Sequence, residues 1–309
     1  MLQVIPLSAE LQKIANEELG EVPQRISEDL MVLKDWIALQ PYLKARTDDQ
    51  FLIQFLRGCK YSLEKAKNKI DKFYALKSKC PELFSVTNVD ECSIRRFHNL
   101  GSVISLPIPL NDCGPRIYIC RCTFDPRDFY VGDGLRYVTA LNEIAMMSDP
   151  YTCICGTLYI MDFANSTTAH LMVLTPNIVR NLIQFFEKTI PVRIKAICII
   201  NLTPYAHKFC NMMLQYAPEK LKNRIHLCGT DLTELEEYLP RKYLPVEYGG
   251  ENGSLDQLCK DYNKVWDEYR EYFKENAQYG TDERLRVGKK IELDGDLGIN
   301  GSFRKLDVD

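Results

Sequence analysis

The sequence has almost no net charge and no long run of apolar residues. Its 39 lysines and arginines nearly balance 42 aspartates and glutamates, so the formal charge is −3. A chain with this balance lacks the broad positive field of a general nucleic-acid binder, and any anion site must be a local patch. No apolar stretch approaches the roughly 20 residues that a membrane-spanning helix needs. These absences favour a globular protein, and the 46% of apolar residues suffices for a sizeable core.

The first residues also lack the features of a secretory signal. Residues 1–13 contain no basic region before their short apolar stretch, which Pro6 and Ser8 interrupt. The chain has 12 cysteines but no C-x-x-C pair. We therefore expect a cytoplasmic protein with reduced thiols.

The cysteines and histidines do not form a pattern that would hold a metal ion. The pairs Cys120/Cys122 and Cys153/Cys155 are spaced i, i+2, which on a strand places both thiols on one face as small buried hydrophobes. Zinc sites usually have wider spacings and histidine ligands, whereas the histidines here are dispersed. Their positions are His98, His170, His207 and His226. We expect no metal and no cofactor.

The usual signatures of enzymes are missing as well. The sequence contains no G-x-S-x-G elbow, no phosphate-binding G-x-x-x-x-G-K-[ST] loop, no G-x-G-x-x-G after a strand and no H-E-x-x-H. Asp162 ends a predicted strand, but an aspartate there more often accepts hydrogen bonds from neighbouring backbone N–H groups. Cys153 or Cys155 would need a histidine partner to act as a nucleophile, and no local pattern provides one. We expect no catalytic activity.

The chain divides into a helical first part and an α/β second part. Residues 9–84 have a helical pattern, with Phe51, Leu52, Phe55 and Leu56 on one apolar stripe. Beyond this part, strand-like runs alternate with helical ones, which predicts crossover connections and a mainly parallel sheet. The predicted strands are 116–124, 156–162, 196–202 and 225–228, and the predicted helices between them are 134–147, 176–188 and 205–217. The predicted domains are 1–88, 89–250 and 251–309.

Capping and spacing support one of these helices and predict one more. Thr175 and Pro176 suit a helix start, and Ile178, Leu182 and Phe185 would then face the sheet. Residues 255–273 form an amphipathic pattern that predicts one more helix. The last thirty or so residues have a composition typical of a disordered tail, although three apolar side chains favour docking of its end. These are Phe303, Leu306 and Val308.

One predicted helix carries more apolar surface than a solvent-facing helix needs. The stripe consists of Phe209, Met212, Met213 and Tyr216 at i, i+3, i+4 and i+7, between Pro204 and Pro218. Packing against the core accounts for such a stripe. A mobile lid is the alternative, since flexible methionines suit a surface that accommodates a lipid or a membrane.

Four basic residues flank this helix. Arg193 and Lys195 share a strand face, while Lys220 and Arg224 are one helical turn apart. They suit an anionic headgroup, and solvated surface charge is an equally good account.

Together these segments resemble the CRAL-TRIO (Sec14-like) family of lipid-binding proteins, collinearly over about residues 30–250. The run Phe-Leu-Ile-Gln-Phe-Leu-Arg at 51–57, with Lys60 and Tyr61, resembles the family's helical N-terminal module. Seven later segments resemble successive parts of its lipid-binding domain. They are 159–162, 175–176, 191–195, 199–201, 220–226, 239–240 and 244–250. The ending at 301–306 is similar to that of the alpha-tocopherol transfer protein-like branch. At Cys59, beside Lys60, the sequence departs from a second arginine that is usual in that branch.

The resemblance implies an all-helical N-terminal domain followed by a CRAL-TRIO α/β domain, with a mainly parallel sheet, an apolar cavity and a lid helix. It implies intracellular binding and transfer of a tocopherol-, retinoid- or phospholipid-like molecule between membranes, with headgroup-assisted release at phosphoinositide-containing membranes. Phe209, Met212, Met213 and Tyr216 would line the lid, and Arg193, Lys195, Lys220 and Arg224 would bind the headgroup. The expected protein is a monomer without catalysis, peripheral on membranes and without a nucleic-acid partner.

Two other functions compete with this hypothesis. A phosphoinositide-responsive membrane adaptor would use the same fold, with a structural lipid in the cavity. A thiol-dependent hydrolase would need a Cys–His pair.

Overall fold

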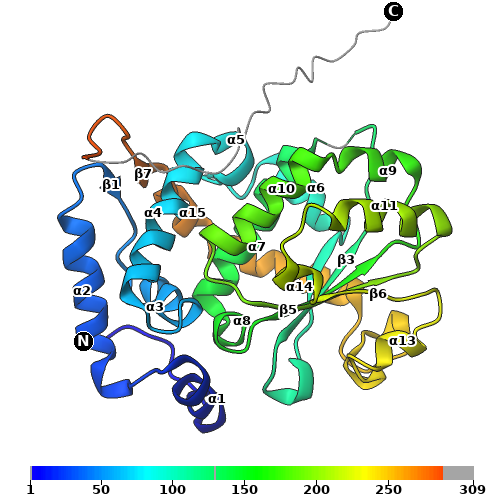
Figure 1. Cartoon of the computed structure of the whole chain (residues 1–309), viewed down its shortest axis with the longest axis horizontal. Helices are drawn as coiled ribbons and strands as arrows, with labels where there is room; N and C mark the ends of the chain where they lie inside the picture. The colour runs from blue at the N-terminus through cyan, green and yellow to red at the C-terminus, as the bar shows by residue number, and fades with distance from the viewer. Residues whose placement is uncertain (1, 129, 288–309) are drawn as a thin grey trace, which may run out of the picture.

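The computed structural model describes residues 2–128 and 130–287. The N-terminal helices lie to one side of a five-stranded sheet, and the C-terminal segment runs back along both parts (Figure 1). The expected docking of Phe303, Leu306 and Val308 concerns residues outside this description.

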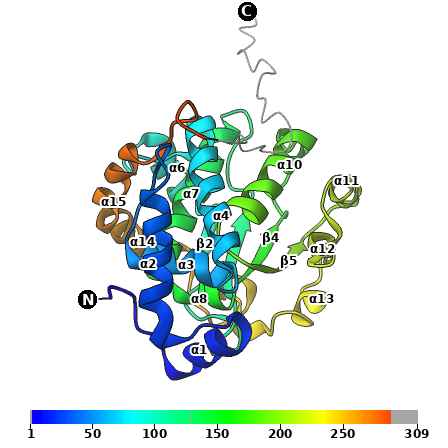
Figure 2. The same ribbon diagram turned by 60° about the vertical axis from the view of Figure 1, so that its left-hand side comes forward.

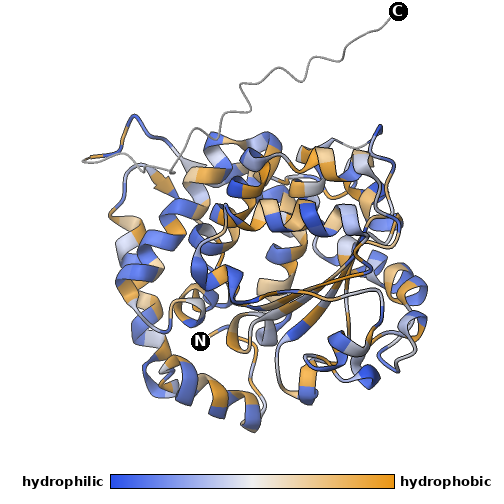
Figure 3. Cartoon of the chain, turned by 45° about the vertical axis from the view of Figure 1, so that its right-hand side comes forward, coloured by the Kyte–Doolittle hydropathy of each residue, from blue (hydrophilic) through white to orange (hydrophobic). Residues whose placement is uncertain are grey.

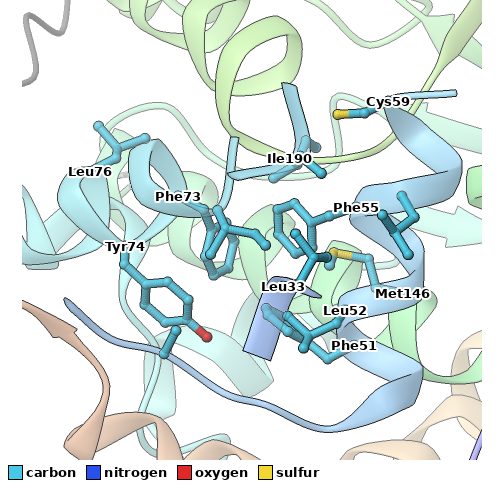
Figure 4. Packing of buried hydrophobic residues seen from close by; sticks show 14 of the residues in the cluster. Leu33, Phe51, Leu52, Phe55, Cys59, Phe73, Tyr74, Leu76, Met146 and Ile190 are labelled. Carbon is cyan, nitrogen blue, oxygen red and sulfur yellow. The ribbon is translucent and has the colours of Figure 1, made fainter. Parts of the chain in front are cut away.

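The N-terminal part is built around a helix that is buried on all sides. Every residue from Gln50 to Arg57 in α3 is buried, so the predicted stripe is only part of the contact surface. Phe51, Phe55 and Phe73 pack edge-on or tilted, with ring centroids 5.2–5.9 Å apart (Figure 4). The helices and the short strand of this part are α1 (Ala9–Ile14), the π-helix η1 (Ala15–Leu19), η2 (Pro23–Arg25), α2 (Ile26–Ala38), β1 (Leu43–Lys44), α3 (Asp49–Gly58), α4 (Leu63–Lys79) and α5 (Pro81–Phe84).

The sheet confirms the α/β prediction. Its order is β2-β3-β4-β5-β6, with β2 antiparallel and the other neighbours parallel. The strands are β2 (Val103–Ser105), β3 (Arg116–Arg121), β4 (Thr157–Asp162), β5 (Ile194–Ile200) and β6 (Ile225–Leu227). All four predicted strands occur at their expected places. The edge strand β2 was missed because three residues are too few to show alternation.

Helices connect and cover these strands. Those before β5 are α6 (Cys92–Asn99), η3 (Leu110–Asp112), α7 (Val131–Ser148), α8 (Pro150–Ile154), α9 (Thr168–Val173), α10 (Pro176–Gln184) and the π-helix η4 (Phe185–Thr189). Those after β5 are α11 (Pro204–Leu214), α12 (Glu219–Lys222), α13 (Thr233–Glu236), η5 (Arg241–Tyr243), η6 (Val246–Tyr248), α14 (Leu255–Glu268), α15 (Arg270–Glu275) and η7 (Asn276–Gln278). The amphipathic pattern of 255–273 is thus two helices that meet at Tyr269.

The prediction that Phe185 faces the sheet is wrong. Phe185 stacks on Phe84 of α5, with ring centroids 5.0 Å apart, and Leu182 packs into the same cluster of the N-terminal helices. Phe186 instead contacts Tyr159 of β4. Periodicity shows that a helix face is buried, but it does not show whether a sheet or another helix covers that face.

The C-terminal segment packs against the N-terminal helical part. Strand β7 (Gly280–Thr281) pairs antiparallel with β1. Arg286 donates two hydrogen bonds to Asp71, at 2.7 and 2.8 Å, and its guanidinium carbon lies 3.7 Å from the ring centroid of Tyr42. A bidentate pair that also stacks on an aromatic ring fixes this end of the described chain.

Candidate functional site

The two faces of the sheet are covered unequally. On the outer face, the apolar side chains of β3, β4 and β5 are buried in one cluster with residues 235–255. On the inner face, under α9 and α11, several apolar side chains stay part-exposed. The residues of the inner face are Tyr118, Cys120, Tyr159, Met161, Ile197, Ile199, Ile225 and Leu227, of which only Tyr118 and Ile199 are buried. The strands are mostly hydrophobic along their length (Figure 3), and the alternating residues of both clusters are apolar, so the two faces differ in what covers them.

The part-exposed thiols of the inner face lie deep in the protein. Burial raises the pKa of Cys120 to about 12 and that of Cys122, just beyond the strand, to about 11. Such shifts require a surrounding of low polarity. The partial exposure of both cysteines agrees with the looser cover of this face.

Aromatic rings continue this surface toward α10. Tyr118 and Tyr159 stack with ring centroids 5.3 Å apart, and Phe186 meets Tyr159 edge-on at 6.2 Å. Burial raises the pKa of Tyr118 to about 12 and raises that of Tyr159 further. Both phenols therefore stay neutral and suit contact with an apolar molecule.

Helix α11 covers the other end of the inner face. Thr203 caps the helix by accepting a hydrogen bond from the Ala206 backbone N–H, and Pro204 occupies its first turn. Ala206, Phe209 and Cys210 pack in one cluster with inner-face residues of the sheet. In Figure 2, α11 stands beyond β5, and α10 lies between it and α4.

The four predicted lid residues divide between two environments. Met213 is 9% exposed and Phe209 is part-buried in the inner-face cluster, whereas Met212 is 47% and Tyr216 38% exposed. The stripe that packs inward is Ala206, Phe209, Cys210 and Met213. Ala206 and Cys210 were not predicted from the sequence, although their i, i+4 spacing has the same helical period. The role of the four residues as a lid stays a prediction.

Three of the four predicted basic residues gather at the start of β5. Arg224 donates to the backbone carbonyl of Ile194, which lies between Arg193 and Lys195. Arg193 donates through Nη1 to the carbonyl of Ile154, at 2.9 Å. This arrangement concentrates positive charge at one end of the sheet.

Two residues near this group were not foreseen. Glu18 of η1 lies 3.4 Å from Arg193 Nη2 and 3.6 Å from Lys195 Nζ. Lys69 of α4 donates hydrogen bonds to the backbone carbonyls of Glu187 and Ile190. Burial lowers the pKa of Lys69, and the positive charge of Lys220 lowers it further. Lys220 therefore lies within electrostatic reach of Lys69. The contacts of Glu18 and Lys69 join segments that are far apart in the sequence, so no local sequence pattern predicts them.

The residues considered for catalysis have structural surroundings. Asp162 accepts hydrogen bonds from the Ala164 backbone N–H, the Asn201 amide and the Tyr248 hydroxyl, which agrees with the structural interpretation. Burial raises the pKa values of Cys153 and Cys155 to about 12, so their thiols are protonated at neutral pH.

One Cys–His contact does occur, between Cys259 and His98. Their Sγ and Nε2 atoms are 3.8 Å apart, but Nε2 is 2.7 Å from the Cys259 carbonyl and the thiol donates to the His98 carbonyl. Burial also raises the pKa of Cys259. The pair is hydrogen-bonded to backbone and lacks an activated thiolate.

Other features do not compete for the site. Among residues 2–128 and 130–287, no three His, Cys, Asp or Glu side chains are placed to hold a metal ion. Within the same residues, no helix combines the length and apolarity needed to cross a membrane. An open hollow of about 550 Å³ next to α15 is polar, with Lys34, Asp48, Asp49 and Glu275 in its lining, and does not suit a hydrophobic molecule.

Comparisons with known proteins agree with this architecture. Residues 111–250 match the CRAL/TRIO domain and residues 22–94 match a domain described as Pinta-like, UBA domain. The mouse (Mus musculus) protein named alpha-tocopherol transfer protein-like is 29% identical over 258 residues, which cover 82% of this chain and 73% of that protein. Human (Homo sapiens) clavesin-2 is 27% identical over 246 residues, covering 79% of this chain and 75% of clavesin-2.

A solved structure titled "Crystal structure of Sfh5" covers 85% of this chain and 100% of its own, with a TM-score of 0.46 and 12% sequence identity. The domain match at residues 111–250 confirms the resemblance found in the sequence: this part of the chain carries the CRAL/TRIO domain. The name of the mouse relative describes transfer and no chemical reaction.

Proposed function

We propose that the chain binds one hydrophobic small molecule against the inner face of its sheet and transfers it between membranes. The part-exposed apolar face under α9 and α11 is the observation that carries this proposal. The class of molecule is tocopherol-, retinoid- or phospholipid-like, and the relatives named for tocopherol transfer support that class. The protein would work in the cytoplasm as a monomer that visits membranes.

The energetics of such binding are favourable. Apolar burial contributes about 25 cal/mol per Å², so a ligand that buries ~400 Å² gains ~10 kcal/mol before ordering costs. The neutral phenols and thiols of the inner face cost little to desolvate because they are already deep. The ligand would therefore be recognised by its shape and its apolar contacts, and few polar groups would fix its orientation.

Release would take place at a membrane that carries phosphoinositides. Arg193, Lys195 and Arg224 surround the start of β5, and Lys220 lies on α12 immediately after α11. The exposed Met172, Tyr205 and Met212 of α9 and α11 offer apolar contacts to the same membrane. Attraction of a headgroup next to α11 would couple docking of the protein on the membrane to opening of this lid helix.

Mass spectrometry of lipid extracted from the purified protein tests the proposal. A single hydrophobic molecule in stoichiometric amount supports transport. Absent or mixed lipid contradicts it and favours the membrane adaptor. A transfer assay between labelled donor and unlabelled acceptor vesicles then measures whether the extracted molecule moves faster with protein than without it.

A further inference from the structure

Helix η1 holds an acidic side chain against two of the basic residues of the proposed headgroup site. Ala15 and Leu19 of this helix are buried in a cluster with Ile154 and Cys155, and the helix ends at Gly20 in a left-handed conformation with φ 77°. The apolar contacts therefore dock the helix independently of charge. Glu18 lies between the two buried residues in sequence and stays 48% exposed.

The carboxylate of Glu18 uses the donors that a phosphate group would need. Arg193 Nη1 is engaged by the Ile154 carbonyl at 2.9 Å, and Nη2 is the atom that lies 3.4 Å from Glu18. Lys195 Nζ lies 3.6 Å from the same carboxylate oxygen. An anionic headgroup that binds Arg193 and Lys195 must take the place of Glu18.

We infer that Glu18 is an internal competitor that sets which anionic lipids the basic group accepts. This inference rests on the proposed headgroup site. When a singly charged headgroup displaces Glu18, one negative charge beside the basic residues replaces another, so the binding free energy changes little. A phosphoinositide with several phosphates carries more charge than the carboxylate it displaces, and Lys220 and Arg224 add further attraction. Glu18 thus discriminates against membranes that are only weakly anionic.

The competing account is that Glu18 merely pairs with surface charges. Such exposed pairs contribute little to stability, so replacing Glu18 should not unfold the protein under either account. Binding to membranes separates the two.

The test compares Glu18→Gln with Glu17→Gln. Both substitutions raise the net charge by one on the same helix, but Glu17 lies 4.0 Å from Lys13 rather than near the basic group. We expect Glu18→Gln to bind phosphatidylcholine vesicles containing phosphatidylinositol bisphosphate about three- to tenfold more tightly than wild type, from the loss of two exposed pairs. Glu17→Gln should change binding less than about twofold. Equal effects of the two substitutions would overturn the inference.

Further experiments distinguish failure of the inference on Glu18 from failure of the proposed headgroup site. The Glu18→Gln effect should shrink in a chain that also carries Lys195→Ala, since only the pair with Arg193 then remains. Soluble inositol trisphosphate is the second probe, and tightening seen only with it would overturn the role at membranes. If Lys195→Ala with Lys220→Ala leaves vesicle binding unchanged, the headgroup site itself is wrong. Lys260→Ala with Lys274→Ala, on α14 and α15, is the matched control for that charge change.

Discussion

The guanidinium of Arg180 lies over the ring of Tyr216, with 5.1 Å between the guanidinium carbon and the ring centroid. This contact joins α10 to the segment immediately after α11, whose inner side packs on the sheet. A cation–π contact at an exposed position contributes about 0.5–1 kcal/mol. It is weak enough to break repeatedly and strong enough to bias the position of α11.

The first prediction concerns this contact. Tyr216→Leu removes the ring and should speed release of bound lipid about two- to fivefold, because α11 loses one of its attachments to α10. Tyr216→Phe keeps the ring and should behave like wild type. Stopped-flow transfer of a fluorescent lipid measures both rates. Identical rates for all three proteins would show that the contact does not restrain α11.

The two neighbouring methionines of α11 should respond differently. Met213→Asp places a charge on the inner side and should release bound lipid, since an unpaired buried carboxylate is costly. Met212→Asp alters an exposed position and should leave lipid retention unchanged while weakening transfer to vesicles. Far-ultraviolet circular dichroism should show near-native helix content for both, because a lid contributes less than the global core. Global unfolding of Met213→Asp would instead identify that side as ordinary core.

These residues also show what the sequence can and cannot predict. The central strands were predictable because strand-like apolar runs alternate with helical ones, an order that is typical of a mainly parallel sheet. The inner side of α11 was predicted only in part, because Met212 and Met213 are both apolar and periodicity alone did not rank them. The Glu18 contact was not predictable, since it joins positions 175 residues apart through tertiary packing.

A pair of cysteines on opposite faces tests for an internal space next to the inner face. Cys120 lies part-exposed on the inner face and Cys198 is fully buried on the outer face. Cys120→Phe should fill the space and abolish lipid binding with little loss of stability. Cys198→Phe should overpack the outer cluster and lower the free energy of unfolding by about 1–3 kcal/mol. Urea unfolding and lipid stoichiometry are the two measurements. Equal destabilisation by both would mean that the inner face is filled by protein.

A buried ion pair joins Glu21, just after η1, to Arg57 of α3. Glu21 and Arg57 are almost fully buried; Arg57 Nε donates to Glu21 at 2.8 Å, and the Tyr61 hydroxyl donates to it at 2.8 Å. Burial alone would raise the pKa of Glu21, but the hydrogen bonds and charge of Arg57 outweigh this effect and lower the pKa below its ordinary 4.5. Because the folded pKa lies below the unfolded one, Glu21 stabilises the protein above about pH 4.5.

That contribution is lost as the pH falls through the lowered pKa of the folded state. Glu21→Gln leaves Arg57 charged and buried, and should lower the free energy of unfolding at pH 7 by about 3–5 kcal/mol. The exposed Glu28→Gln is the control and should cost little. Urea unfolding from pH 7 to pH 3 should show the difference between wild type and Glu21→Gln shrinking below pH 4.5. A difference that stays constant over this range would mean that the stability of the pair does not depend on ionisation of Glu21.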